Sequence, residues 1–392
     1  MKQQKVSMLS LLAIFMVFLL QGGGGGLNPA VNGIAEGLNM DPAVVTQVGT
    51  FPAIFIVIVS LFAGRYVGDK FKYKTVLLVA IIFYGLGGAL PLFIHSWTAV
   101  MISRACVGIG VGAFYPLAPA LILKLYEGAK QGNMMGIGNA VATAGGIVTQ
   151  LLSGLLVDIN WTYAFGVHLI GIISLVFVAI GLSEPEKEEN IEKQEKVKIK
   201  LPARVYVNNS IILLFMMLSL PLILSLSVII VDRGFGTGLV AGTAMSMFTI
   251  GGTVWSLIFG PLYKTFKRFT TVLVLLVCTL GMVVVYYAAN LAMIFVGMFI
   301  VGMGLLIVPS LMMDNNKLIT PDSITFSSSM VVVFMYIGNF LASYFLIVVG
   351  NIASNLNVAY PALFISVLLM AAMTILWFMV RWKQGEPESQ EQ

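Results

Sequence analysis

The stretch 98-TAVMISRACVGIGVGAFYPLAPALIL-123 carries one charged residue, Arg104, in an otherwise apolar run. A helix of roughly 20 mostly apolar residues is long enough to cross the hydrocarbon core of a lipid bilayer. The stretch therefore predicts a membrane-spanning helix, and the residues on either side of it show that the pattern repeats.

The composition of the whole chain points the same way. Hydrophobic residues make up 59% of the 392 residues and charged residues 10%, whereas a soluble domain carries about a quarter charged residues. Lipid must therefore be the solvent for most of the surface.

The first apolar run follows Lys2 and Lys5 and has no small-x-small cleavage site, so we expect a retained helix and not a cleaved signal.

Charges, proline, asparagine and glycine divide the chain into twelve apolar stretches long enough to span a bilayer. The sequence therefore predicts an all-α membrane protein with twelve transmembrane helices. They are expected near 7–35, 43–64, 75–94, 98–123, 133–156, 161–182, 209–231, 239–263, 270–288, 291–312, 326–349 and 358–380.

The positions of lysine and arginine predict the orientation. If the N-terminus is cytoplasmic, all of the 22 basic residues except Arg104 and Arg233 fall in cytoplasmic segments. Such enrichment sets the orientation of membrane proteins. We therefore expect a multi-pass protein of the plasma membrane with both ends inside. The net charge of +5 is met by anionic lipid and needs no nucleic-acid partner.

A charged segment, EPEKEENIEKQEKVKIKLPAR, separates two sets of six predicted helices. We expect it to be a solvated cytoplasmic linker, more a tether than a binding element. The predicted organisation is an N-terminal half at 1–183, a linker at 184–207, a C-terminal half at 208–383 and a cytoplasmic tail at 384–392.

The two halves share features at a common offset. GDKFKYKTVLL (68–78) follows the second predicted helix and YKTFKRFTTVL (263–273) follows the eighth. The fourth and tenth predicted helices each contain a Gly-x-Gly pair and a proline: Gly108, Gly110 and Pro116, and Gly302, Gly304 and Pro309. Six-helix repeats of this kind build many secondary transporters, with the substrate site between the halves.

With these motifs, the chain resembles the major facilitator superfamily over essentially its whole length. The family's loop between helices two and three carries Gly-x-Leu-x-Asp-Arg-x-Gly-Arg-Lys, and Asp69, Lys70 and Lys74 match its charges in kind. Lys72 stands where the family has its second glycine. In the second half, Arg268 keeps the corresponding position. The resemblance implies that these four matching charged residues form cytoplasmic gates.

The fourth predicted helix also resembles the family. Its Arg104-x-x-x-Gly108 is similar to the family's Arg-x-x-x-Gly motif. The fifth helix lacks the Gly-Pro that marks the drug/proton antiporters of the family, which makes a multidrug exporter less expected. The resemblance implies a monomeric secondary transporter with two six-helix pseudo-repeats.

Arg104 is the sharpest candidate for a functional residue. A charge in the hydrocarbon region costs roughly 3 kcal/mol or more unless it faces water or a partner. We expect Arg104 to line a cavity, where it binds an anionic group or steers proton coupling. The structural alternative is a cap that bonds to backbone carbonyls near the first helix.

The first predicted helix contains five consecutive glycines, 22–26. Each costs roughly 1 kcal/mol of helix propensity relative to alanine. Irregular backbone is tolerated in a bilayer only where protein or a water-filled cavity provides partners for its N–H and C=O groups. The glycine run therefore predicts a flexible helix that faces the cavity. Tight packing through small residues is an equally weighted alternative.

Polar residues in several predicted helices are candidates for lining the substrate cavity. Each is also explained by hydrogen bonding between helices, and His168 by packing. The candidates besides Arg104 are Gln21, Asn28, Asn32, Tyr115, Asn139, Thr143, Gln150, Ser225, Ser227, Tyr336 and Asn339.

Acidic residues bear on energy coupling. None lies at the centre of a predicted span, and Glu36, Asp158 and Asp232 lie at predicted outer ends. These three are candidates for coupling transport to protons or to exchange.

The predicted function is secondary active transport of a small solute, with a small organic anion preferred because Arg104 has no matching central carboxylate. Export of lipophilic or cationic compounds is the alternative within the family. An intramembrane enzyme is disfavoured because no nucleophile–base, paired-carboxylate or metal set appears in the spans. No phosphate-binding loop appears either, so we do not expect ATP-driven pumping by this chain. Two dissimilar halves joined by a linker suit a monomeric carrier better than a symmetric channel pore.

With Cys106 and Cys278 far apart and two histidines in the chain, we expect no metal and no cofactor. The expected partners are a small-molecule substrate and membrane lipid.

Overall fold

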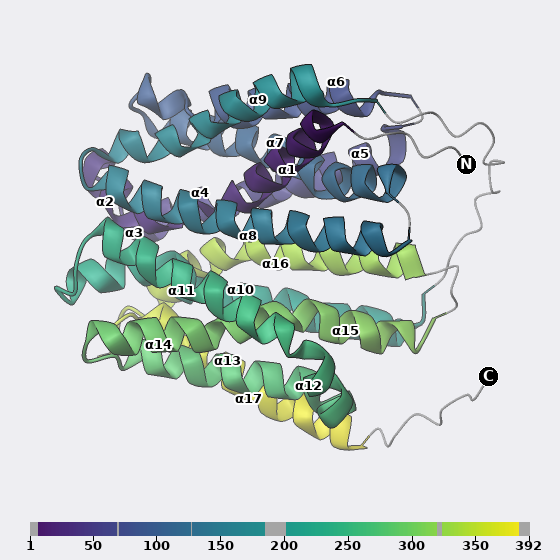
Figure 1. Cartoon of the computed structure of the whole chain (residues 1–392). Helices are drawn as coiled ribbons and strands as arrows, with labels where there is room; N and C mark the ends of the chain where they lie inside the picture. Colours follow the sequence, from purple (N-terminus) through teal and green to yellow (C-terminus); the bar gives the residue numbers. More distant parts are fainter. Residues whose placement is uncertain (1–6, 69, 127, 185–200, 320–323, 384–392) are drawn as a thin grey trace. The chain divides into compact units, whose positions relative to one another are not determined.

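The computed structural model describes residues 7–68, 70–126, 128–184, 201–319 and 324–383. Every regular element in these ranges is a helix (Figure 1). The prediction of an all-helical protein is confirmed.

The helices up to residue 181 fill the predicted first half, and most predicted spans contain more than one helical element. Several elements are single turns of 3-10 helix, and η3 is π-helical. In chain order they are α1 (Met8–Gly22), η1 (Gly23–Gly25), η2 (Asn28–Ala30), α2 (Val31–Leu38), α3 (Pro42–Val45), α4 (Gln47–Thr50), α5 (Pro52–Tyr66), α6 (Tyr73–Ile82), η3 (Phe83–Gly87), η4 (Leu90–Leu92), α7 (Trp97–Leu125), α8 (Gly128–Val157), η5 (Trp161–Leu169) and α9 (Ile170–Gly181).

The helices after the predicted linker are on average longer. The first of them begins at Ala203, inside the segment 184–207 that we predicted to be the linker. In chain order they are α10 (Ala203–Asp232), α11 (Gly238–Leu257), α12 (Phe259–Phe266), η6 (Lys267–Phe269), α13 (Thr270–Tyr286), α14 (Leu291–Val301), η7 (Gly302–Leu306), α15 (Ile307–Asn316), α16 (Ile324–Ile352) and α17 (Pro361–Lys383).

The membrane-spanning segments agree with the predicted twelve. In the described ranges, 11 helical segments are long and apolar enough to cross a bilayer. The predicted eighth span differs, because it divides into α11 and the short α12 near Leu257. α11 is not among the 11 segments, since glycine, serine and threonine recur along it and lower its hydropathy. With α11, the twelve-helix architecture is complete.

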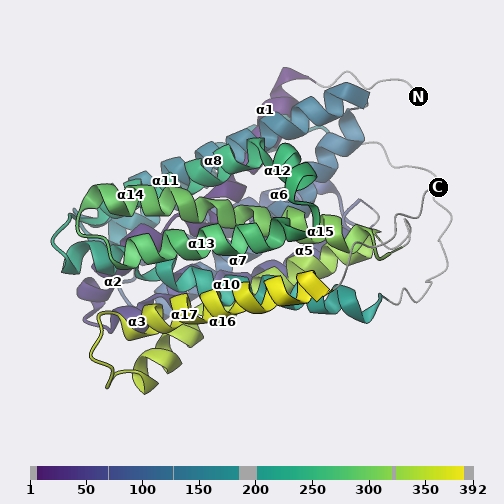
Figure 2. The ribbon, with the colours of Figure 1, turned by 90° about the horizontal axis from the view of Figure 1, so that it is seen from below.

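The chain forms two compact units. The first comprises Met1–Val197 together with Leu224–Ser246, and the second comprises Lys198–Ile223 together with Met247–Gln392. Within each unit the long helices run alongside one another (Figures 1 and 2). The outer end of α10 and the first half of α11 thus belong to the unit that contains α1 to α9.

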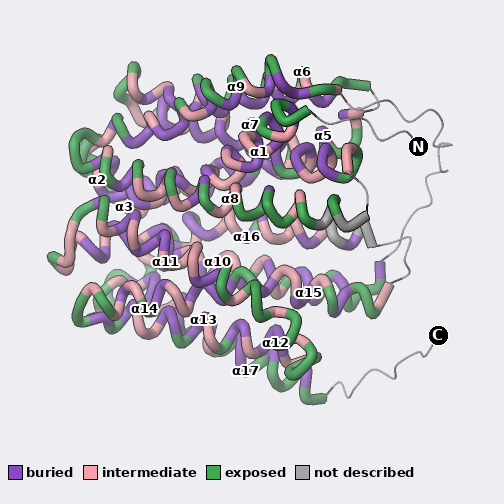
Figure 3. Tube along the Cα trace, viewed as in Figure 1, coloured by how far each residue is buried: buried purple, intermediate pink, exposed green. Residues whose placement is uncertain are grey.

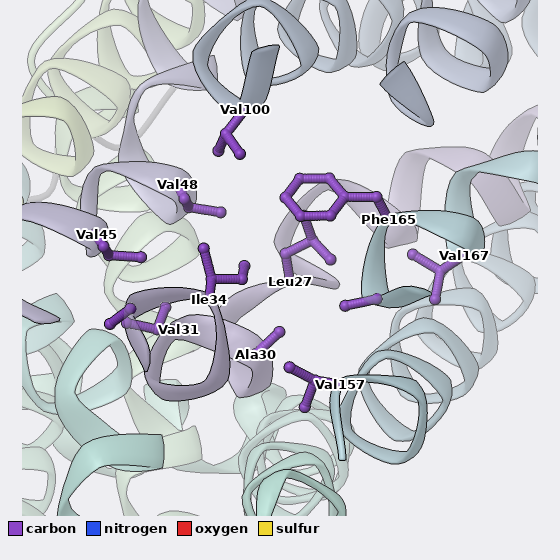
Figure 4. Packing of buried hydrophobic residues seen from close by; sticks show 12 residues of the cluster. Leu27, Ala30, Val31, Ile34, Val45, Val48, Val100, Val157, Phe165 and Val167 are labelled. Atoms are coloured by element: carbon purple, nitrogen blue, oxygen red, sulfur yellow. The ribbon is translucent and has the colours of Figure 1, made fainter. Parts of the chain in front are cut away.

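Buried and exposed residues alternate along the helices in the way expected of a membrane protein (Figure 3). Large apolar side chains such as Ile180, Leu257 and Ile352 are at least 71% exposed, which is tolerable because lipid surrounds the helices. Inside the first unit, apolar residues of η2, α2, α4, α7 and η5 pack into one cluster, which includes Leu27, Ile34 and Phe165 (Figure 4).

Candidate functional site

Arg104 lies in the second turn of α7 and is completely buried. α7 begins after Ser96, whose hydroxyl oxygen accepts the N–H of Ala99 at 3.2 Å and caps the helix. Farther along, a Cβ at Gly108 would lie 3.0 Å from Pro52 Cα, and one at Gly112 would lie 3.0 Å from the carbonyl oxygen of Ile56. Glycine at these positions lets α5 and α7 approach closely, so Arg104 lies on a helix that is tightly packed against its neighbour.

The guanidinium group of Arg104 contacts neutral groups. Its Nη2 lies 2.7 Å from Nε2 of His168 and 3.2 Å from Oγ of Ser103. A guanidinium group only donates hydrogen bonds, so Nε2 of His168 accepts and the ring proton lies on Nδ1. Arg104 Cζ also lies 5.5 Å from the centre of the Phe165 ring, a cation–π distance. None of the groups that Arg104 contacts in the described ranges is a carboxylate.

Tyr84 completes the surroundings of His168. Its ring meets the imidazole edge-on, with ring centres 4.9 Å apart. Tyr84 lies in η3, a π-helical turn of the kind often found at functional sites. Beside it, the carbonyl oxygen of Gly88 accepts the hydroxyl of Ser103 at 2.6 Å. The Tyr84 hydroxyl and His168 Nδ1 are buried without a hydrogen-bond partner among the described residues, which leaves unused hydrogen-bonding capacity in the cluster.

These contacts bear on two predictions. The structural alternative for Arg104 was a cap on backbone carbonyls near the first helix, and in the described ranges its hydrogen bonds go to side chains of α7 and η5 instead. His168, for which we expected a packing role, is fully buried and is also the hydrogen-bond partner of Arg104. A local pattern could not have paired these residues, because 64 positions separate them.

The glycine run of helix one packs against α8. A Cβ at Gly22 would collide with the carbonyl oxygen of Ala142, and one at Gly26 would lie 3.0 Å from Thr149 Cβ. The hydroxyl of Ser153 donates to the carbonyl oxygen of Gly26 at 2.5 Å. This geometry fits the alternative of tight packing through small residues, and the helix continues as the 3-10 turns η1 and η2 instead of as a regular α-helix.

Several predicted lining residues of the first unit lie near this break. Gln21 Oε1 and Asn28 Oδ1 are buried without a hydrogen-bond partner among the described residues. The backbone N–H of Asn32 donates to Oγ of Ser227 at 3.3 Å, and its Nδ2 donates to Glu36 Oε1 at 2.7 Å. Two buried acceptor oxygens near the break are thus left without a donor in the described part of the chain.

The remaining lining candidates are spread through both units. Asn139 and Tyr115 are exposed, Thr143 and Gln150 are partly buried, and Tyr336 of α16 is buried. Asn339 Oδ1, also on α16, is buried without a partner among the described residues. Which of these positions share one cavity stays a prediction.

The predicted cytoplasmic gate residues have diverse surroundings. Asp69 lies outside the described residues. Lys70 Nζ lies 5.2 Å from the centre of the Tyr66 ring. Arg268 stacks over Phe269, with Cζ 4.8 Å from the ring centre. In Lys74 it is the backbone that contacts an acid: its N–H donates to Oε2 of Glu184 at 3.0 Å.

Glu184 is one residue that the sequence analysis did not single out. Its Oε1 also accepts the N–H of Tyr73 at 2.6 Å, so the carboxylate caps the start of α6 from 110 residues away. Its position at the first residue of the charged linker made it look like one solvated charge among many.

A second overlooked site is the buried ion pair of Asp314 and Arg381. Arg381 Nη2 donates to Asp314 Oδ2 at 2.5 Å, and the Tyr263 hydroxyl donates to Asp314 Oδ1 at 3.2 Å. The half-exposed Lys317 lies 3.9 Å from Asp314 Oδ1. Asp314 and Arg381 both follow directly after predicted spans, at ends that we predicted to be cytoplasmic, and this was the available signal. The pair ties α12, α15 and α17 together.

Of the predicted coupling candidates, Asp158 accepts three hydrogen bonds from the start of α11 and the residue before it. Its carboxylate accepts the Thr237 hydroxyl at 2.6 Å, the Gly238 N–H at 2.8 Å and the Leu239 N–H at 3.1 Å. Glu36 accepts from Asn32, as described above, and Asp232 is exposed at the end of α10. In the described part of the chain, no group of three histidine, cysteine, aspartate or glutamate side chains is placed to hold a metal ion.

The helices and the buried polar cluster define a polytopic membrane protein with charged residues inside its helix bundle. The family model of the Major Facilitator Superfamily matches residues 13–343. The chain therefore belongs to the major facilitator superfamily of transporters.

Individual relatives match shorter segments. The chain is 33% identical over 112 residues to Multidrug resistance protein 3 of Bacillus subtilis, covering 28% of this chain and 22% of the relative. It is 28% identical over 137 residues to the probable sulfoacetate transporter SauU of Cupriavidus necator, covering 34% and 31%. The chain thus spans less than a third of the length of either relative.

A solved structure matches the whole fold. A mutant form of the nucleoside transporter NupG superposes with a TM-score of 0.77 at 12% identity, covering 96% of this chain and 100% of that one. At this identity the likeness concerns the fold alone.

Proposed function

We propose that the protein is a secondary active transporter that moves a small organic anion across the plasma membrane by alternating access. The observation that carries the proposal is Arg104, a fully buried cation whose contacts in the described ranges are all with neutral groups. A buried charge is costly unless a partner compensates it. An anionic substrate would supply that compensation during transport.

The anion need not touch Arg104 in the conformation described. In a protein interior with an effective dielectric constant near 20, two unit charges 10 Å apart attract by about 2 kcal/mol. Buried charges are also screened weakly by salt. The guanidinium therefore favours an anion anywhere in its neighbourhood, and the unmatched oxygens of Gln21 and Asn28 would bind hydrogen-bond donors of the same ligand.

The relatives support an anionic substrate as one of two options. SauU is named as a probable sulfoacetate transporter, and sulfoacetate is a small organic anion. Multidrug resistance protein 3 supports the second option, export of lipophilic compounds, because its matched segment has the higher identity, 33%. The charge of Arg104 favours the first option.

Orientation, location and coupling complete the proposal. The distribution of lysine and arginine supports a cytoplasmic N-terminus and C-terminus. Glu36, Asp158 and Asp232 remain candidates for coupling to protons or exchange. We also infer that the chain acts as a monomeric carrier and not as an enzyme.

The test is uptake into proteoliposomes of a panel of labelled carboxylates, sulfonates, nucleosides and lipophilic cations. We expect saturable uptake of an anion, lowered about tenfold or more by Arg104→Ala, since a loss of about 1.4 kcal/mol is tenfold. Arg104→Lys is the matched control that keeps the charge and should retain a substantial part of the uptake. Saturable transport of lipophilic cations alone, insensitive to Arg104→Ala, would replace the anion proposal by the exporter.

A further inference from the structure

A hollow of about 210 Å³ lies at the C-terminal end of α17, on the surface of the second compact unit. It is lined by Phe378, Met379, Trp382 and Lys383. Residues four apart lie on the same face of a helix, so these side chains form one continuous strip along α17. All four are exposed, Trp382 to 67%. Since α17 is apolar enough to cross a bilayer, the apolar part of the hollow is open to a lipid chain.

Aromatic contacts connect this hollow to a second element. Phe269, the last residue of η6, lies 5.8 Å from Phe378 and 6.5 Å from Trp382, measured between ring centres. The rings of Phe378 and Trp382 are themselves 5.8 Å apart. Arg268 stacks on the outer member of this group, with Cζ 4.8 Å from the centre of the Phe269 ring, a cation–π distance. The rings thus join α17 to η6 and hold a guanidinium group next to the side chains that line the hollow.

The cations at this place have no carboxylate partner in the described part of the chain. Lys267, Arg268 and Lys383 form no ion pair there, and Nη1 of Arg268 is buried without a hydrogen-bond acceptor among the described residues. Lys267 has a φ of 44°, which is uncommon in a residue with a side chain. Asp314 of α15 pairs with Arg381 instead. The hollow is therefore flanked by positive charge that the described residues leave without a counter-ion.

An anionic phospholipid matches both parts of this surface. Its acyl chains are apolar, and its phosphate oxygens accept strong hydrogen bonds from guanidinium and ammonium groups. Lysine and arginine at the cytoplasmic ends of membrane helices attract the anionic headgroups of the inner leaflet. Tryptophan is enriched at the headgroup level, where Trp382 would lie. A zwitterionic lipid offers the same chains without a net charge to match the cations.

We propose that η6 and the C-terminal end of α17 form a binding site for one anionic phospholipid of the cytoplasmic leaflet, with an acyl chain in the hollow and the phosphate near Arg268 and Lys383. The proposed orientation places both elements on the cytoplasmic side. The site does not depend on the proposed transport activity, because all of its residues belong to one compact unit. A bound lipid would add contacts between α17 and η6.

The experiment is native mass spectrometry of the purified full chain, titrated with phosphatidylglycerol or phosphatidylcholine of identical acyl chains. We expect the parent to bind the first phosphatidylglycerol about tenfold more tightly, a difference of about 1.4 kcal/mol. Arg268→Gln and Lys383→Gln should each lower that affinity about fivefold, since one basic residue near an anionic headgroup contributes about 1 kcal/mol. Neither should change the affinity for phosphatidylcholine. Arg268 is also a predicted gate residue, so the readout is lipid binding and not transport.

Three further variants control for folding, charge and shape. Arg268→Lys keeps the charge and should retain most of the affinity. Lys317→Gln removes a cation on the same predicted side that already has Asp314 at 3.9 Å, and it should leave the affinity for phosphatidylglycerol unchanged. Met379→Trp fills the hollow without changing the charge and should weaken the binding of both lipids.

Two outcomes would overturn the lipid site. One is equal affinity of the parent for the two lipids, which would leave an ordinary interfacial belt of aromatic residues. The other is an equal loss in Lys317→Gln and Lys383→Gln, which would indicate diffuse attraction by a basic surface. Either result together with saturable, Arg104-dependent anion uptake would remove the lipid site and leave the proposed function standing.

Discussion

The two fully or nearly fully buried arginines of the described chain are held in opposite ways. Arg381 donates to the carboxylate of Asp314, and both are about 5% exposed. Arg104, with no exposed surface, has the imidazole of His168 and the hydroxyl of Ser103 instead. One cation carries its own counter-ion within the fold, and the other does not.

The presence or absence of a buried counter-ion suggests different roles for the two arginines. A buried ion pair joins helices, and removing one partner leaves an uncompensated charge. A charge without a counter-ion in a membrane protein is costly and is therefore expected where function requires it. We read Arg381 as part of a pin between α12, α15 and α17, and Arg104 as a charge reserved for a ligand.

The largest expected effect is that of breaking the Asp314–Arg381 ion pair. Arg381→Ala leaves Asp314 buried without its closest cation, so the free energy of unfolding should fall by about 3–5 kcal/mol. Thermal unfolding and the yield of monodisperse protein in detergent measure this. Lys317→Ala is the control: Lys317 lies 3.9 Å from Asp314 and its side chain is 46% exposed, so its loss should cost less than about 1 kcal/mol. Equal stability of Arg381→Ala and the parent would remove the contrast between the two arginines.

An intermediate effect is expected at His168. His168→Leu removes the nearer of the two acceptors of the Arg104 guanidinium and should destabilise the protein by roughly 1–3 kcal/mol, because one buried N–H is left unmatched. His168→Gln can still offer an acceptor oxygen and should recover part of the loss. Thermal unfolding of the two variants, compared side by side, tests whether the hydrogen bond matters. If Leu and Gln behave alike, the imidazole serves as packing alone.

The smallest effect is expected at Tyr84. Its hydroxyl is buried and has no hydrogen-bond partner among the described residues, so Tyr84→Phe should change the free energy of unfolding by less than about 1 kcal/mol, in the stabilising direction if at all. Tyr286→Phe is the matched control, since the Tyr286 hydroxyl donates to the carbonyl oxygen of Ala359 at 2.6 Å. That variant should lose about 1 kcal/mol. A clear loss of stability in Tyr84→Phe would indicate a partner for its hydroxyl.

Most of the fold was predictable from the sequence. Hydropathy located the spans, and the motifs around Asp69 and Arg104 pointed to the superfamily that the match over residues 13–343 confirms. The interruptions were missed. The π-helical turn at Tyr84 and the break between α11 and α12 near Leu257 lie in stretches whose hydropathy gives no sign of them.

The candidate site was predictable in part. Arg104 stood out because a charge in an apolar span is rare, and that signal is visible in the local sequence without knowing what the residue contacts. Its partner His168, the cap of α6 by Glu184 and the cap of α11 by Asp158 were not paired in advance. Each joins residues at least 64 positions apart, and a single sequence carries no signal for such a contact.

The sequence by itself determined that this chain is a helical membrane protein with two related halves, because crossing a bilayer requires long apolar helices and these are visible locally. Tertiary structure alone decided which charges are neutralised. Asp314 pairs with Arg381, and Arg104 contacts an imidazole, because of how helices distant in the chain pack together. That packing, more than the presence of the charges, separates the buried ion pair from the proposed anion site.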